Sequence, residues 1–490
     1  MSLDKRELFK IFGETRVFDD EKTLLHYAQD QSFSPARKPD FVVFAEKVEE
    51  IQQLVRLAND TLTPIVPYSS GLNLHGAALP DQGGIVLNMT RMDKILHVDE
   101  KNWFVVVEPG VTFKQLQEEL MKRGFRIMIP FGAAPGRSVL TSYLERDPVL
   151  AAPSFEYGNF LIMDTEIVLP DGGIFRTGLW SSGGNPGGPM GPVRNILFRL
   201  WTGAQGTLGI MTKMAMQITP FIKQRKIYYI TFQEISDAIE PLRMIQKREI
   251  GMECFLLNRF NLAALVNEEW NIPETFPTTP KPSESFNHLK KLLPPWVMII
   301  CINGGLRQSG KKIAYEEEAL QEICRNLNVE VKDSLPQVRA LNRMLMNELI
   351  YPWGILKKFN YRGSVHDLTF KSSLKYIAEM EELIKKSCNA LGYDACSVGG
   401  YVLPLERGRA VHCEFDLHCD LKDVKETDKV RGVWLKVSEA LMNHRAYFDQ
   451  PYGAWAEMVY QRSGNYTRKL KEIKAELDPH GILNPGKLCF

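Results

Sequence analysis

The chain has 490 residues, with 60 Lys and Arg against 59 Asp and Glu, and a formal net charge of +1. This length favours two domains, and the near-neutral charge excludes the strong positive field of a nucleic-acid-binding protein. The first ten residues are charged rather than apolar, and the longest apolar run, Trp296 to Ile302, is far too short for a membrane span. Eight cysteines lie scattered without a Cys-x-x-Cys pair. We therefore expect a cytoplasmic protein with reduced cysteines, no iron–sulfur site and a small-molecule partner.

Residues 1–37 are expected to form a polar preface with one short helix. A short apolar run at 41–44 predicts a strand. Apolar residues at helical spacing follow it and predict a crossover helix, namely Val48, Ile51, Val55 and Ala58.

The stretch from Pro64 to Pro80 is the most informative part of the chain. A short apolar piece ends in Ser69 and Ser70, and Gly71, Asn73 and Gly76 then allow a tight turn with free backbone N–H groups. Such groups in a concave loop bind anions. Because the loop lacks a P-loop lysine and a Gly-x-Gly-x-x-Gly motif, a pyrophosphate is favoured over a triphosphate with magnesium. Taken alone, the pattern also fits a plain turn between strands.

Residues 103–107 predict another strand, and Thr112 with Gln115 three residues later predicts a helix start. Residues 130–160 show little regular pattern. Residues 181–192 hold five Gly and three Pro, which excludes a helix or strand and leaves an ordered excursion or a flexible loop.

Beyond Pro220, strand-like runs alternate with helical stretches, which predicts an α+β cap with its helices on one side of a sheet. The expected strands are 226–232, 252–257, 296–302 and 410–417, and the expected helices include 313–324 and 374–390. Six prolines in 268–295 predict a surface loop, which could cover a substrate entrance.

The strand at 410–417 continues into a polar pattern that has three open interpretations. Alternation places His412, Glu414, Asp416 and His418 on one face and apolar side chains on the other. The polar face could be a solvated outer surface, a substrate site that uses His412 or Glu414, or a metal site.

Five further motifs accompany the Pro64 to Pro80 loop in a fixed order. They are Gly-Gly-Ile-Val-Leu-Asn-Met (83–89), Val-Val-Val-Glu-Pro-Gly-Val-Thr (105–112), Glu-Ile-Val-Leu-Pro-Asp-Gly (166–172), Gly-Thr-Leu-Gly-Ile-Met-Thr (206–212) and Asp-Pro-His-Gly-Ile-Leu-Asn-Pro-Gly-Lys (478–487). Together with the loop they resemble the FAD-binding domain of the vanillyl alcohol oxidase and p-cresol methylhydroxylase flavoproteins. The resemblance is specific over residues 38–220 and at the C-terminal tail.

The resemblance implies an α+β protein in which a p-cresol methylhydroxylase-type FAD-binding domain carries an α+β, ferredoxin-like cap with the substrate site. The implied boundaries are a preface at 1–37, the FAD-binding domain at 38–221, the cap at 222–440 and a C-terminal return at 441–490. The cofactor contacts that it implies are Pro67, Tyr68, Ser69, Ser70, Gly71, Leu72, Asn73, Leu74, Pro109, Gly110, Ser138, Thr141, Ser142, Glu166, Gly206, Gly209, Ile210 and Asn484.

The chain departs from the family's phenol-oxidising branch at three places. The family's loop Tyr falls near His75, its C-terminal Tyr-Arg pair corresponds to Tyr452 followed by Gly453, and its acidic residue near the flavin corresponds to Asn159. The resemblance supports FAD but leaves the 4-alkylphenol substrate open. The catalytic candidates are Tyr452, His75, His412 and Glu414.

A covalent flavin and a resident metal are not expected. Arg409 stands near the position where some relatives carry the linking His, and Ser69-Ser70 stands where doubly linked relatives carry another. The His-x-Gly-Asp-Gly-Asn-x-His pattern of metal-using 2-hydroxy-acid relatives is missing. The expected cofactor is therefore non-covalent FAD.

The expected function is hydride transfer from a small para-hydroxylated aromatic alcohol or alkylphenol to FAD. The alternatives are a 2-hydroxy-acid dehydrogenase, a flavin-carrying subunit of a larger electron-transfer complex, and a flavin-fold protein without activity. A homodimer is expected, with a separate electron-acceptor protein as a further partner. The reoxidant, oxygen or another acceptor, stays open.

Overall fold

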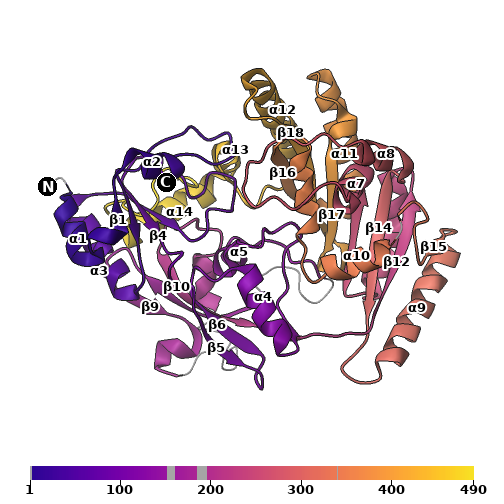
Figure 1. Cartoon of the computed structure of the whole chain (residues 1–490), viewed down its shortest axis with the longest axis horizontal. Helices are drawn as coiled ribbons and strands as arrows, with labels where there is room; N and C mark the ends of the chain where they lie inside the picture. The colour runs from indigo at the N-terminus through magenta and orange to yellow at the C-terminus, as the bar shows by residue number, and fades with distance from the viewer. Residues whose placement is uncertain (1–2, 152–160, 185–195, 339) are drawn as a thin grey trace.

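The computed structural model describes residues 3–151, 161–184, 196–338 and 340–490. Its strands form three main sheets in two lobes, which Figure 1 shows side by side. In the part of the chain that the structure describes, no helix is both long and apolar enough to cross a membrane.

The first sheet has four strands in the order β1-β2-β4-β3, and its last three strands are parallel. Helix α3 (Val48–Thr61) is the crossover between β2 and β3, and it buries the predicted apolar stripe. The preface holds more structure than the single expected helix, because it contains α1 (Lys5–Phe12), η1 (Glu14–Arg16) and α2 (Glu21–His26) as well as β1. The strands are β1 (Val17–Phe18), β2 (Phe41–Phe44), β3 (Ile65–Tyr68) and β4 (Ile85–Asn88).

The second sheet is antiparallel, with the strand order β5-β6-β10-β8-β9. Its strands are β5 (Ile95–Asp99), β6 (Phe104–Val107), β8 (Ile162–Val168), β9 (Ile174–Arg176) and β10 (Ile210–Gln217). Helix α4 (Phe113–Lys122) begins as predicted, since the Thr112 hydroxyl accepts the backbone N–H of Gln115 at 3.2 Å. Short elements complete this lobe, namely β7 (Phe125–Arg126), α5 (Val139–Leu144), η3 (Gly178–Ser182), η4 (Ile196–Leu200) and β11 (Thr219–Pro220).

The second lobe is built on a seven-stranded antiparallel sheet with the order β15-β12-β14-β13-β17-β18-β16. The strands are β12 (Arg225–Phe232), β13 (Glu253–Asn258), β14 (Trp296–Asn303), β15 (Val331–Lys332), β16 (Ser364–Ser373), β17 (Gly399–Leu405) and β18 (Ala410–Cys419). Alternate residues of β12 and β14 enter two different hydrophobic clusters. The sheet is therefore buried on both faces.

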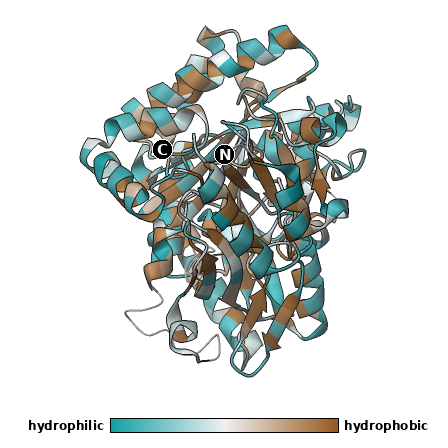
Figure 2. Ribbon diagram, turned by 90° about the vertical axis from the view of Figure 1, so that its left-hand side faces the viewer, coloured by the Kyte–Doolittle hydropathy of each residue, from teal (hydrophilic) through white to brown (hydrophobic). Residues whose placement is uncertain are grey.

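Helices cover both faces of this sheet, so the expectation of helices on one side was wrong. One face carries α6 (Ile239–Lys247), α9 (Ser309–Asn326), α11 (Ile377–Ala390) and α12 (Val424–Asn443). The other carries α7 (Arg259–Val266), α8 (Glu284–Leu292) and α10 (Leu341–Glu348). Figure 2 shows hydrophobic colour along the strands and hydrophilic colour on the outer faces of many helices. The short 3-10 helices of this lobe are η5 (Ile235–Ala238), η6 (Gly354–Asn360), η7 (Leu374–Tyr376), η8 (Ala395–Ser397) and η9 (Glu406–Gly408).

Burial on both faces also corrects the interpretation of the polar strand face as a solvated outer surface. His412, Asp416 and His418 on β18 are buried, and the apolar face packs as expected. The α+β fold itself is confirmed. The proline-rich stretch from 268 to 295 is not wholly a loop, because it contains α8.

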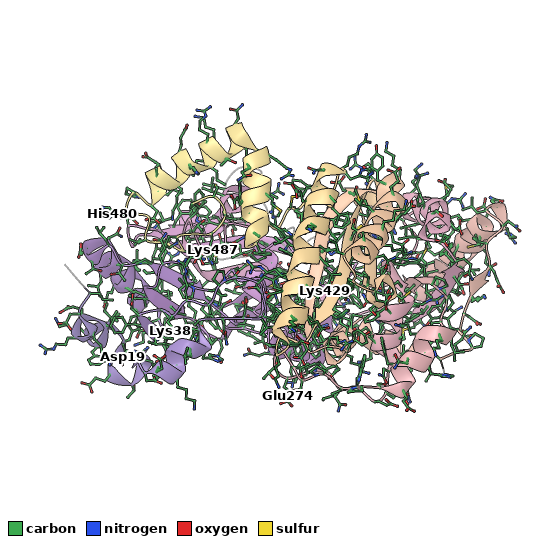
Figure 3. The ribbon with its side chains drawn as sticks, turned by 90° about the horizontal axis from the view of Figure 1, so that it is seen from above. Asp19, Lys38, Glu274, Lys429, His480 and Lys487 are labelled. Carbon is green, nitrogen blue, oxygen red and sulfur yellow. The ribbon has the colours of Figure 1, made fainter. Side chains whose placement is uncertain are left out.

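The end of the chain returns towards the first lobe through α13 (Ala454–Arg462) and α14 (Gly464–Leu477), although Trp455 of α13 packs into the hydrophobic cluster of the second lobe (Figure 1). Beyond α14, the backbone N–H of Ile65 donates to the oxygen of Ile482 at 2.7 Å. The N–H of Asn484 donates back to the oxygen of Ile65 at 2.9 Å. Lys487, which is labelled in Figure 3, pairs with Asp81 at 2.8 Å. The tail is thus fixed beside the Pro64 to Pro80 loop.

Candidate active site

The loop that follows β3 has the free backbone that its sequence predicts. Gly71 has a φ of +66°, which favours glycine. Among the described residues, no hydrogen bond uses the backbone N–H groups from Ser69 to Asn73. The Ser69 and Thr141 hydroxyls share a hydrogen bond of 2.6 Å, and the Ser70 hydroxyl accepts the N–H of Ser138 at 3.1 Å. The loop is held from one side while its amides stay available to a ligand.

This loop forms one wall of a cavity in the first lobe, the cofactor cavity. Predicted contacts that line it are Pro67, Ser69, Ser70, Gly71, Leu72, Asn73, Pro109, Thr141, Gly206, Gly209 and Ile210. The other lining residues are Ala77, Ala78, Met89, Arg137, Leu140, Leu144, Glu145, Trp201, Ala204, Gln205 and Met211. The cavity therefore combines a run of free amides with a largely apolar interior.

Four predicted contacts lie outside the lining, and their side chains form hydrogen bonds or ion pairs with other protein groups. The Ser138 hydroxyl donates to the oxygen of Pro109 at 2.6 Å, and the Ser142 hydroxyl donates to Asp147 at 2.6 Å. Glu166 is paired with Lys213 at 2.9 Å and with Arg176 at 2.8 Å. The Asn484 side chain donates to the oxygen of Gln205 at 2.6 Å and so supports a cavity residue.

The last three predicted contacts also fall outside the cavity lining. Tyr68 lies at the end of β3, where its ring contacts that of Tyr27. Gly110 packs tightly, since an added Cβ would lie 2.6 Å from the oxygen of Thr90. Leu74 lines a neighbouring chamber instead.

The cofactor cavity fits FAD. The five free amides suit a pyrophosphate, because neutral N–H groups in a concave turn stabilise negative charge. Gly206 lines the same cavity with a φ of +72°, and a Cβ there would lie 2.9 Å from Pro67. Apolar walls suit the flavin ring. The described lining residues include no His, Cys or Tyr.

A second cavity, the chamber, shares Leu72, Asn73 and Arg137 with the cofactor cavity. All four predicted catalytic residues line it, namely Tyr452, His75, His412 and Glu414. Its lining is mixed, because apolar and aromatic side chains, such as Phe131, Phe276, Leu356, Phe359, Val365 and Trp455, lie beside about as many polar ones. Phe276 comes from the proline-rich stretch, which therefore does reach this site.

Tyr452 lies in the chamber wall, but its hydroxyl is already engaged. It donates a hydrogen bond to Glu145, whose carboxyl lines the cofactor cavity. Burial and the nearby Glu145 raise the pKa of Tyr452 well above its ordinary value. Burial also raises the pKa of Glu145, against the effect of the bond from Tyr452. Tyr452 thus presents mainly its ring, which stacks on His75 with centroids 5.2 Å apart and an interplanar angle of 6°.

Elsewhere in the chamber lining, Lys358 of η6 contacts two acidic side chains of β18. Its ammonium lies 2.7 Å from Glu414 and 2.7 Å from Asp416, and the Lys358 side chain is 6% exposed. Burial raises the pKa of Glu414 to about 8, although the ammonium opposes that rise. Burial and Lys371 lower the pKa of His412 well below its ordinary value, so this imidazole is neutral. Its Nδ1 is enclosed and has no hydrogen-bond partner among the described residues.

Sequence reasoning missed several chamber residues. In the sequence, Lys358 stands beside Lys357, and such a pair is typical of an exposed surface. Asp367 and Tyr401 lie on β16 and β17, two strands that the sequence analysis did not predict. Burial raises the pKa of Tyr401 well above its ordinary value, and its hydroxyl has no partner among the described residues. Alternation along 364–373 was the signal that could have found Asp367.

The remaining site predictions concern Arg409, the Asn159 region and metal. The Arg409 side chain is 80% exposed and pairs with Glu406, so it does not face either cavity. Residues 157–160 and 185–192 lie outside the described residues. Across the described ranges, no group of three or more His, Cys, Asp or Glu side chains is arranged to hold a metal ion.

Known proteins resemble the chain along its whole length. The protein family of the FAD-binding domain matches residues 39–178, and the family of the C-terminal domain of FAD linked oxidases matches residues 452–488. Glycolate oxidase subunit GlcD of Bacillus subtilis (strain 168) is 23% identical, over 99% of this chain and 96% of that protein. The flavoprotein subunit of 4-cresol dehydrogenase (hydroxylating) from Pseudomonas putida is 31% identical, over 43% of this chain and 42% of that protein.

The solved structure of 4-ethylphenol oxidase from Gulosibacter chungangensis superposes with a TM-score of 0.81. It is 24% identical, and the match covers 98% of this chain and 95% of that chain. This likeness shows a shared fold over both lobes.

Proposed function

We propose that this chain, an FAD-linked oxidase, oxidises a small, uncharged, para-hydroxylated aromatic alcohol or alkylphenol. FAD, when bound, accepts a hydride from a substrate carbon. The protein must then orient that carbon towards the cofactor cavity and receive a proton from the attached oxygen. The chamber adjoins the cofactor cavity and is the place for both tasks.

The pairing of the chamber's cations carries the proposal. Among the described residues that line the chamber, the cationic side chains are Arg137 and Lys358. Arg137 lies 2.6 Å from Asp147, and Lys358 lies 2.7 Å from Asp416. A substrate carboxylate would have to compete for cations that are already paired with a protein carboxylate in a partly buried site. The apolar and aromatic part of the lining suits an uncharged ring instead.

We propose that the flavin is held without a covalent bond. Covalent flavin attachment needs a nucleophilic side chain, and the described residues of the cofactor cavity include no His, Cys or Tyr. The pyrophosphate would be held by the amides from Ser69 to Asn73, with Thr141 beside them. Gly206, Gly209 and Ile210 would form the opposite wall.

Four chamber residues are our candidates for contact with the substrate's oxygen or its proton. They differ in which of their polar atoms already have a partner within the protein. Tyr452 donates to Glu145, and Glu414 is bound to Lys358 through one oxygen. His412 is neutral and enclosed. The His75 side chain is 28% exposed, and its ring makes no hydrogen bond among the described residues.

A second candidate function is oxidation of a small 2-hydroxy acid. The similarity to a glycolate oxidase subunit over 99% of the chain favours it. That function would require Arg137 or Lys358 to exchange a protein carboxylate for the substrate's own. This relative is named as a subunit of a glycolate oxidase. A separate electron-acceptor protein is therefore part of this alternative.

Anaerobic bleaching of the flavin absorbance by a substrate panel tests the proposal. We expect bleaching by 4-hydroxybenzyl alcohol or 4-ethylphenol, and none by glycolate or D-lactate. Bleaching by the 2-hydroxy acids alone would overturn the proposal in favour of the second candidate. A yellow protein that no compound bleaches would also contradict it and would favour a subunit that needs its partner.

A further inference from the structure

Two ionisable side chains from different lobes, those of His75 and Asp367, lie close together in the lining of the chamber. Nε2 of His75, in the cofactor loop, lies 3.8 Å from Oδ1 of Asp367 on β16. Both residues also line a third cavity, the vestibule, which adjoins the chamber. The other residues of the vestibule include Ser32, Phe33, His366, Arg431, Trp434 and Lys487. The pair therefore lies where the vestibule meets the chamber.

Each member of the pair is fixed by contacts of its own. The Thr369 hydroxyl donates to Asp367 Oδ2, and the Trp434 indole N–H donates to the Asp367 backbone oxygen at 3.0 Å. The backbone N–H of His75 donates to the Asn73 side chain at 3.2 Å, and its ring stacks on Tyr452. Such support restricts the imidazole to a narrow range of orientations.

We propose that His75 is the proton acceptor for the substrate's hydroxyl group and that Asp367 is the residue that positions His75 and stabilises its protonated form. This inference rests on the proposed function. The substrate O–H bond breaks and an N–H bond forms on His75. The electron pair of the C–H bond leaves as hydride, which FAD would accept, and a C=O bond forms. The chain holds the transferred proton as an imidazolium beside a carboxylate.

The geometry assigns the two ring nitrogens. A carboxylate near Nε2 favours the neutral tautomer with its hydrogen on Nε2. Nδ1 then carries the lone pair, and it makes no hydrogen bond among the described residues. At 3.8 Å the pair is not a hydrogen bond, so the attraction grows mainly when His75 becomes charged. That is the behaviour expected of a group that stabilises a proton-transfer product.

The groups facing His75 support this assignment. On β16 they are Asp367 and His366, and from the C-terminal return Tyr452. Burial would raise the pKa of Asp367, but His75, the Thr369 hydroxyl and Lys358 together hold it below its ordinary value. Burial lowers the pKa of His366 to about 3, and its ring stacks on Phe33. Asp367 is therefore ionised and His366 is neutral near pH 7.

The test compares wild-type protein with Asp367→Asn, which keeps the side-chain shape and removes the charge. The chain contains nine histidines, and histidine labelled with 15N in the ring reports the tautomer of each by NMR, with His75→Gln identifying the His75 signals. We expect the preference of His75 for the Nε2–H tautomer to weaken in Asp367→Asn, because the carboxylate 3.8 Å from Nε2 is gone. With a substrate from the panel, we expect kcat/KM to fall about tenfold or more in this variant.

A surface pair supplies the matched control. His444 Nε2 lies 3.3 Å from Glu379, and both side chains are more than half exposed. Glu379→Gln should change neither the His75 tautomer nor kcat/KM. A His75→Ala variant should regain activity with added imidazole.

The outcomes separate this inference from the proposed function. An unchanged His75 tautomer in Asp367→Asn, or full activity of His75→Gln on a turned-over substrate, would overturn the His75–Asp367 assignment alone. Bleaching by none of the aromatic compounds would overturn the proposed function, while the NMR comparison would still decide whether Asp367 orders the His75 ring.

Discussion

The Tyr452 hydroxyl donates its hydrogen to the carboxyl of Glu145, a residue of the first lobe whose side chain lines the cofactor cavity. The bond joins the C-terminal return to the helix that borders the cavity, and both side chains are buried. Glu145 would be left without this donor if the hydroxyl were removed.

Tyr452→Phe should therefore lower turnover by about tenfold or more, because it removes the donor to Glu145 where the chamber wall meets the cofactor cavity, while FAD stays bound, because the free amides from Ser69 to Asn73 are untouched. Steady-state turnover and the ratio of visible to protein absorbance measure the two effects. Tyr466→Phe, on an exposed tyrosine, is the matched control. Full rate and affinity in Tyr452→Phe would show that the hydroxyl serves packing only.

Gly71→Val should severely weaken FAD binding. The position has a φ of +66°, and a Cβ would lie 2.0 Å from the Tyr68 hydroxyl oxygen. A β-branched side chain is strained there and would displace the loop whose amides face the cavity. Flavin content after purification is the measurement. Gly13→Val is a suitable control, since Gly13 has a similar φ of +75° and open space around it. Equal flavin content in both variants would contradict this placement of the pyrophosphate.

Acid precipitation should release the flavin. No described residue of the cofactor cavity offers a His, Cys or Tyr for attachment, so unfolding removes everything that holds the cofactor. After centrifugation we expect the yellow colour in the supernatant. A washed pellet that stays yellow would demonstrate a covalent bond.

Stability should decline as the pH rises from about 4.3 towards 8. Burial raises the pKa of Glu348 to about 8, whereas the pKa of a glutamate in an unfolded chain is about 4.3. The folded state binds the extra proton in this window, so the contribution is complete below about pH 4.3 and is lost as the pH rises through the folded value. The slope for one proton is at most about 1.4 kcal/mol per pH unit.

Glu348→Gln should therefore lose less stability than wild type between pH 5 and pH 8, as thermal melting at each pH would reveal. Glu414 has a pKa raised in the same direction, so part of the decline remains. Glu284→Gln, on an exposed residue of α8, should follow the wild-type curve. Parallel curves for Glu348→Gln and wild type would refute the assignment.

Local patterns predicted the parts of the structure that depend on local physics. The turn at Gly71, the Thr112 helix cap and the stripe of α3 follow from backbone freedom, side-chain hydrogen bonds and apolar spacing. Alternation on β18 correctly separated its polar and apolar faces. It could not reveal that helices cover the polar face as well, because that depends on the connections of all seven strands.

The candidate site was predictable only in part for the same reason. His75 and Tyr452 were found through their positions in motifs, but Asp367 acts on His75 through a contact between lobes. Lys358 is recognisable as a chamber residue only once β18 brings Glu414 and Asp416 to it. No spacing along the sequence records these distances.

The tail contact at Asn484 makes the cofactor cavity depend on two distant parts of the sequence. Its backbone pairs with Ile65 and its side chain holds Gln205 of the cavity wall. The loop after β3 can form its turn through local contacts, but the wall behind it is complete only when the residues around Asn484 have docked. Completion of this cavity is therefore a long-range folding event, separate from the local folding of the loop.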